Sequence, residues 1–130
     1  MSKNYDSLIK GGTLATHESA EPVDIAIKDG QFAALGSLSD SEAGEIADEV
    51  IDATGLTILP GVIDTQVHFR EPGLGAKEDL ESGSRAAVMG GVTAVFEMPN
   101  TKPPTTTAEA VAEKVSLGQD RMHCDFAFYV

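Results

Sequence analysis

Four polar residues stand at every second position of the stretch PGVIDTQVHFREPG (residues 60–73), namely Asp64, Gln66, His68 and Arg70. If this stretch is a β-strand, the four side chains point to one face, because successive side chains of a strand alternate between faces. An imidazole can bind a metal ion, and a guanidinium offers a planar fork of donors that matches a carboxylate. The stretch is therefore a candidate site, with the solvated face of an ordinary amphipathic strand as the alternative.

The chain changes character near residue 60, and the part before it is predicted to be β-rich. Short strands are expected over residues 6–16, 22–30 and 31–38, and Asp29-Gly30 between two alternating apolar runs indicates a hairpin. The acidic segment 39–49 is expected to be an exposed loop. Residues 49–61 are expected to form another strand pair, broken at Thr54-Gly55.

From residue 60 onward, strands are predicted to alternate with helices. The expected strands are residues 62–69, 91–99 and 123–130, and the expected helices are residues 77–91 and 108–118. Thr106 and Glu109 resemble a capping box that opens the second helix. Alternation of this kind favours parallel βαβ units, so the predicted fold class is α/β, with candidate ligands at the carboxyl ends of the strands.

The expected parallel sheet changes the interpretation of the polar positions. Strands of such a sheet are covered on both faces, so the stripe that holds Asp64, His68 and Arg70 is not expected to face solvent, and a functional role is favoured. Asn100 lies just beyond the next strand, where ligand binding is favoured over turn formation beside proline. Glu97 stays unassigned because strand parity is unsafe next to a proline.

Composition limits the partners and the compartment. The chain has 130 residues and a formal net charge of −12, which repels nucleic acid and anionic membranes, so the expected partners are small molecules or proteins. The single cysteine, Cys124, excludes an internal disulfide framework and fits a reducing compartment. No run of about 18 apolar residues occurs, and a cytoplasmic location is expected.

The stretch PGVIDTQVHFREPG, followed by KEDLESGSRAAVMGGVTAVFEMPNTKPPT, resembles dihydroorotases of the amidohydrolase superfamily, and the likeness runs from about Lys10 to the chain end. The resemblance implies a (β/α)8 barrel of the TIM type that carries one or two zinc ions, together with a small β-domain. On this basis residues 1–59 would belong to the β-domain. Residues 60–130 would be the first two βα units and the third strand of a truncated barrel.

The resemblance also assigns roles to individual residues. His68 would be a metal ligand, and Arg70 with Asn100 would hold the carboxylate of the substrate. Asp64 is expected to orient groups of the metal site. Gln66 stands where the family has its first metal-binding histidine, and a neutral amide is a poorer zinc ligand, so this ligand position is weak or lost. No catalytic residue is expected in this segment, because the general base would lie beyond Val130.

The implied activity is the zinc-dependent interconversion of N-carbamoyl-L-aspartate and dihydroorotate in pyrimidine biosynthesis, with the 130-residue chain inactive alone. Two alternatives stay open. One is a non-catalytic dihydroorotase-like partner of aspartate transcarbamoylase, which Gln66 favours. The other is a related cyclic amidase of the allantoinase or hydantoinase type, although such relatives usually lack the arginine at position 70. The resemblance leaves a homodimer or an association with aspartate transcarbamoylase as the expected assembly.

Overall fold

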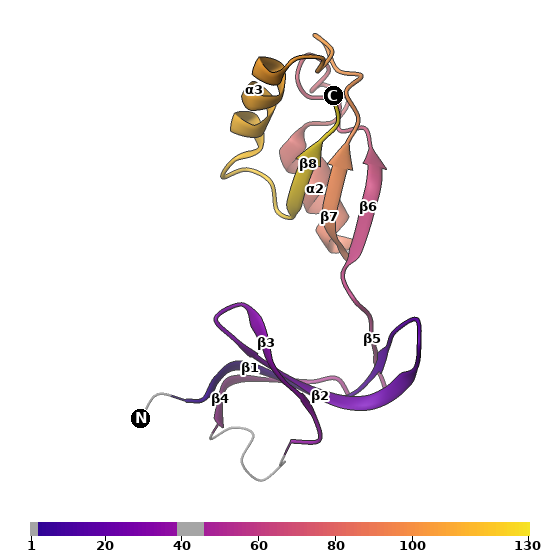
Figure 1. Ribbon diagram of the computed structural model, residues 1–130, viewed down its shortest axis with the longest axis vertical. Helices are drawn as coiled ribbons and strands as arrows, with labels where there is room; N and C mark the ends of the chain where they lie inside the picture. The colour runs from indigo at the N-terminus through magenta and orange to yellow at the C-terminus, as the bar shows by residue number, and fades with distance from the viewer. Residues whose placement is uncertain (1–2, 39–45) are drawn as a thin grey trace. The chain divides into compact units, whose positions relative to one another are not determined.

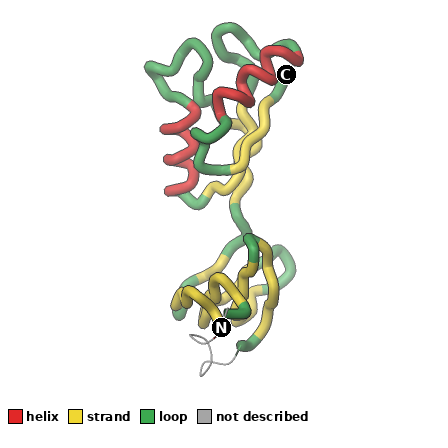
Figure 2. The backbone as a smooth tube through the Cα atoms, turned by 90° about the vertical axis from the view of Figure 1, so that its left-hand side faces the viewer, coloured by secondary structure: helices red, strands yellow, loops and turns green. Residues whose placement is uncertain are grey.

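A computed structural model describes residues 3–38 and 46–130, which form two compact units that divide between Pro60 and Gly61. Strands dominate the first unit, whereas strands alternate with helices in the second (Figures 1 and 2). Neither of the helices in the described residues is long and apolar enough to cross a membrane.

The first unit is a mixed five-stranded sheet. Its strand order is β3-β2-β1-β4, and β5 also pairs with β1. The β1–β2 and β2–β3 pairs are antiparallel, whereas β4 and β5 both run parallel to β1. The strands are β1 (Tyr5–Ala15), β2 (Ala20–Lys28), β3 (Gln31–Gly36), β4 (Ala47–Asp52) and β5 (Thr57–Ile58).

The hairpin expected at Asp29-Gly30 is confirmed, with positive φ angles of 51° and 71° at these two residues. The strand pair expected over residues 49–61 is wrong in its pairing, because β4 and β5 each pair with β1 and not with one another. β4 pairs with β1 from Tyr5 to Lys10 and β5 pairs with Thr13 and Leu14, so both strands run along the same edge of β1, one after the other.

The expectation of a loop over the acidic segment 39–49 is wrong for residues 47–49. Residues 39–45 lie outside the described residues, and residues 47–49 belong to β4. Ala47 explains why the chain is a strand here, because it is fully buried in the small core of this unit against Leu8 and Ala26. Burial of one small apolar residue therefore overrides the acidic composition around it.

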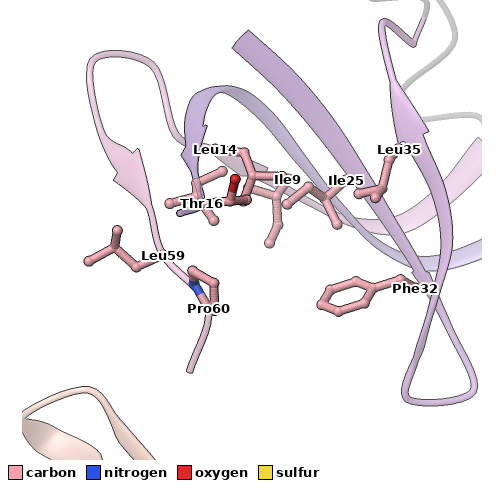
Figure 3. Close-up of a pocket in the computed structure, with 9 residues that line it drawn as sticks. Ile9, Leu14, Thr16, Ile25, Phe32, Leu35, Leu59 and Pro60 are labelled. Carbon is pink, nitrogen blue, oxygen red and sulfur yellow. The ribbon is translucent and has the colours of Figure 1, made fainter. Parts of the chain in front are cut away.

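An apolar groove of about 350 Å³ opens on the first unit (Figure 3). Phe32 is 76% exposed at this groove, and the lining in the described residues is apolar apart from Thr16. Hydrocarbon side chains offer no acid, base or metal ligand, so we place the candidate site in the second unit. The groove is lined among others by Ile9, Ile25, Leu35, Ile58 and Leu59.

The second unit is a parallel three-stranded sheet with the order β6-β7-β8, which confirms the expected βαβ arrangement. Helix α2 packs against β7, α3 packs against β8, and the two helices contact each other on one face of the sheet (Figure 1). The elements are β6 (Val62–Val67), α2 (Leu80–Met89), β7 (Val92–Glu97), α3 (Ala108–Gly118) and β8 (Asp125–Phe128).

Both helices begin at side-chain caps. The Asp79 carboxylate accepts a hydrogen bond from the backbone N–H of Ser82, and the Ser82 hydroxyl completes a capping box. The cap of α3 was expected at Thr106, but the structure places it at Thr107, whose hydroxyl accepts from the Ala110 N–H. The helix begins at Ala108, so the N-cap is the residue before it, Thr107, whose backbone is extended with φ −135° and ψ 161°.

A buried ion pair lies between β7 and α3. Lys114 Nζ is 2.7 Å from Glu97 Oε2, and both side chains are only 1% exposed. Lys114 also donates to the Met98 carbonyl at 3.3 Å and lies 4.9 Å from the centroid of the Phe128 ring. Burial raises the pKa of Glu97, whereas Lys114 and the backbone N–H groups of Arg70 and Phe69 lower it.

Gly73 allows two loops of the second unit to approach each other. Its φ is +87°, and a Cβ at this position would collide with the Lys102 carbonyl.

We expect Gly73→Ala to destabilise the fold by about 1–3 kcal/mol more than Gly91→Ala. Gly91 is the matched control because its φ is +86° and no atom lies within 4 Å of its missing Cβ. Denaturant unfolding of the longest polypeptide that carries this sequence measures the difference, and equal losses would contradict the crowding.

Lys114→Met should destabilise the same polypeptide by about 3–5 kcal/mol, because it leaves the buried Glu97 carboxylate without its cation. Replacing both residues with methionine should recover most of that loss.

The cost of Lys114→Met should depend on pH. Burial holds the pKa of the Glu97 carboxyl in the folded state above its value in the unfolded state. The contribution of this carboxyl to the free energy of unfolding is therefore present at low pH and is lost as the pH rises through the folded-state pKa. Unfolding at about pH 5 and about pH 8 should therefore show the smaller deficit at the lower pH, and a deficit independent of pH would count against this assignment.

Candidate active site

The direction of the β6 side chains is fixed by packing at the carboxyl end of the strand. Val67 and Phe69 pack with Leu80 and Val95 in the core of the second unit. The Phe69 ring lies so close to Gly83 of α2 that a Cβ there would collide with it. With these apolar side chains facing the helices, alternation turns Gln66 and His68 to the other face. The register of β6 against β7 shifts between Asp64 and Val67, so this alternation does not by itself place Asp64.

The polar face of β6 is more open than the sequence suggested. Asp64 and Gln66 are exposed, as is Ile63 on the opposite side of the strand. The expectation that both faces are covered is therefore wrong for the described residues, because both helices pack on one face of the sheet. Asp64 Oδ1 accepts the backbone N–H of Gln66 at 3.0 Å, so it contacts Gln66 and, among the described residues, not the His68 ring.

His68 and Asn100 meet at the ends of neighbouring strands. His68 Nδ1 lies 2.8 Å from Asn100 Oδ1. Because an amide oxygen can only accept, this contact assigns the proton to Nδ1 and leaves the lone pair on Nε2. A metal-binding histidine is held in this way, with its other ring N–H donated to a fixed oxygen. The sequence placed Asn100 on a substrate carboxylate, whereas the structure shows its amide oxygen on His68, with the amide NH2 left for a ligand.

The loops that follow β6 and β7 hold these two residues together. The Met98 N–H donates to the Val67 carbonyl at 3.0 Å, and the Lys102 N–H donates to the Pro72 carbonyl at 3.0 Å. The close approach of Gly73 to Lys102 adds a third contact between the same loops. The carboxyl ends of β6 and β7 therefore carry His68, Arg70 and Asn100 close to these loops, and we call these three residues the polar rim.

Arg70 lies in this rim with an unusual backbone. It is half-buried, and its φ of 69° places it in the left-handed region, which costs a residue other than glycine about 1–2 kcal/mol. The next residue, Glu71, accepts hydrogen bonds from Arg121 and from the Leu80 N–H. Neither Glu71 nor Arg121 was predicted from the sequence, because 50 residues separate them and no short-range pattern links them.

The described residues do not complete a zinc site. A catalytic zinc is bound by three protein ligands and one water or substrate. Among residues 3–38 and 46–130, no group of three or more histidine, cysteine, aspartate or glutamate side chains could hold a metal ion. His68 Nε2 supplies one good ligand and the Gln66 amide at most a weak one. Further ligands would have to come from other residues.

Comparison with known proteins identifies the family. A sequence model of the Amidohydrolase family matches residues 57–125, which include β6, α2, β7 and α3. The chain is 40% identical over 130 residues to an allantoinase of Bacillus licheniformis, covering 97% of this chain and 28% of that protein. It is 42% identical over 126 residues to an allantoinase of Rubrobacter xylanophilus, covering 96% of this chain and 27% of that protein.

Solved structures agree with this likeness. The L-hydantoinase (dihydropyrimidinase) from Arthrobacter aurescens superimposes with a TM-score of 0.89 at 36% identity, over 96% of this chain and 27% of that chain. A D-hydantoinase from Thermus sp. superimposes with a TM-score of 0.78 at 33% identity, over 95% and 27%. The chain thus spans about a quarter of the length of these relatives, and the predicted α/β fold class is confirmed. The matched family, together with the solved folds, shows that this chain belongs to the amidohydrolase family.

Proposed function

We propose that this chain is part of a cyclic amidohydrolase of the allantoinase or hydantoinase type. The chain would supply the polar rim of the active site. The observation that carries the proposal is the His68–Asn100 contact at the carboxyl ends of β6 and β7. It holds one imidazole in a fixed tautomer, with Nε2 available to a metal ion or a reacting group. Such an enzyme adds water to a ring carbonyl, breaks the ring C–N bond and protonates the departing nitrogen.

The class of ring substrate follows from the relatives. Proteins called allantoinase are 38–42% identical to this chain over 95–97% of its length. The two solved structures compared with it are called hydantoinases. These names favour a cyclic ureide without a carboxylate, such as allantoin or hydantoin, and fit less well with dihydroorotate, the carboxylate-bearing ring that the sequence motifs favoured. The allantoinase or hydantoinase alternative is therefore the proposal here.

Dihydroorotate stays the second candidate because of Arg70. Arg70 is half-buried as a residue, and among the described residues no carboxylate forms an ion pair with it. A guanidinium in this position suits a substrate that carries a carboxylate, as dihydroorotate does and as unsubstituted hydantoin and allantoin do not. Arg70 therefore separates the two candidates experimentally.

The substrate class can be tested with the longest natural polypeptide that carries this sequence, assayed on allantoin, hydantoin and dihydroorotate. We expect higher kcat/KM for allantoin or hydantoin than for dihydroorotate. Arg70→Met should lower turnover of dihydroorotate by roughly 10- to 100-fold if the guanidinium binds its carboxylate, and should affect an uncharged ring much less. Preferred turnover of dihydroorotate would overturn the proposal in favour of the second candidate. A lack of turnover on all three rings would favour the non-catalytic partner.

Gln66 gives a prediction about metal content. Residues 66 and 68 lie on one face of β6, so Gln66→His places two imidazoles where they can converge on one ion. Zinc per chain and turnover should both rise in the variant. Thr65→His is the matched control, since the same imidazole then stands one position away and points to the other face. A parent enzyme that is fully active with one zinc, and unimproved by histidine at position 66, would contradict the idea of a weakened ligand position.

A further inference from the structure

We propose that Arg121 is a positioning residue whose ion pair with Glu71 holds the backbone of Arg70, and so fixes the direction of the Arg70 guanidinium in the rim. The inference rests on the proposed function, because it concerns the same site, and it bears on which ring substrates that site accepts. Arg121 lies in the connection between α3 and β8, outside the motifs that the sequence pattern indicates.

The Glu71 carboxylate joins three parts of the second unit. Arg121 binds it through both ends of the guanidinium, with Nη1 at 3.1 Å from Oε1 and Nη2 at 3.2 Å from Oε2. Glu71 Oε2 also accepts the backbone N–H of Leu80 at 2.9 Å, at the first turn of α2. Arg121 Nη1 donates in addition to the Leu117 carbonyl at 2.9 Å, near the end of α3. Glu71 is therefore fixed to both helices.

The residue on the other side of Arg70 is fixed as well. The Phe69 side chain is 7% exposed and packs in the core against Leu80 and Val95. The Arg70 carbonyl accepts the Leu74 N–H at 3.0 Å. The residue before Arg70, Phe69, is therefore held by apolar packing, and the residue after it, Glu71, is held by the ion pair with Arg121.

These two contacts, together with the interaction between the Arg70 backbone N–H and the buried Glu97 carboxylate, account for the left-handed φ of Arg70. Three described residues other than glycine have a positive φ, namely Asp29, Arg70 and Asp120. Aspartate visits this region readily because its short side chain bonds the local backbone, whereas arginine does not. A backbone in this state persists only where its surroundings over-determine it. Loss of the ion pair between Glu71 and Arg121 would let Arg70 relax to a negative φ and turn its side chain away from the rim.

A bidentate arginine suits this task better than a simple charge. The planar fork fixes the orientation of the Glu71 carboxylate as well as its position, which a lysine would not do. Glu71 is the better covered partner, because its side chain is 18% exposed whereas that of Arg121 is 38% exposed.

The chain offers a matched control in the pair of Arg85 and Glu81. This pair is longer, at 3.6 Å, lies on the surface of α2 at i and i+4, and leaves the Arg85 side chain 63% exposed. The two arginines are thus similar in chemistry, but the Arg85 guanidinium pairs within its own helix and not with the loop that follows β6. Arg85→Met should remove a charge without disturbing Arg70.

The test is a double-mutant cycle in the longest natural polypeptide with dihydroorotate as the substrate, because Arg70 is expected to bind its carboxylate. Arg121→Met should raise KM about 5- to 10-fold with kcat within about 2-fold, because only the fraction of molecules with Arg70 in place binds well. In an Arg70→Met background, Arg121→Met should have no further effect. Effects that multiply would overturn the proposal, as would an equal loss in Arg85→Met.

A second measurement does not depend on turnover. Amide hydrogen exchange in a peptide covering residues 69–74 should be faster in Arg121→Met than in the parent, and unchanged in Arg85→Met. Glu71→Gln should reproduce the effect, and takes the place of Arg121→Met if that variant does not fold. Faster exchange without turnover on any ring would keep the positioning role and overturn the proposed function. Turnover with unchanged exchange would overturn the positioning role alone.

Discussion

The packing of Phe69 against α2 is the constraint on which the site depends. The ring fills the space that Gly83 leaves open, beside Leu80 and Val95, and this contact fixes which side chains of β6 face the helices. A shift of one residue would exchange the two faces of the strand and bury His68 in place of Phe69. The polar rim is thus held in place by an apolar contact on the opposite side of the same strand.

Much of the fold could be predicted from local patterns. The hairpin at Asp29-Gly30 and the alternation of strands and helices after residue 60 depend on residues close together in the chain, and both were predicted correctly. The parallel pairing of β4 and β5 with β1 could not be predicted, because it depends on contacts between residues far apart in the chain. The cap of α3 was displaced by one residue because three consecutive threonines are equally suitable by type.

The candidate site was predictable in its members but not in its contacts. Alternation along one strand is a local property, so the sequence alone places Asp64, Gln66 and His68 on one face. The contact of His68 with Asn100 spans 32 residues, so only the parallel pairing of β6 and β7 reveals it. Glu97 is a clearer case, since its burial against Lys114 depends on which face of β7 it occupies, and the neighbouring proline hid that parity.

The interaction most central to the proposed site is the one by which Asn100 holds His68 in the tautomer that leaves Nε2 free. Nitrogen NMR of the imidazoles in the longest natural polypeptide tests it directly, at a pH where the ring is neutral. We expect a proton on Nδ1 and a bare Nε2 for His68, and loss of this single tautomer in Asn100→Ala, while His123 is unchanged. A His68 ring protonated on Nε2 in the parent protein, or a tautomer indifferent to the Asn100 substitution, would contradict this role of Asn100.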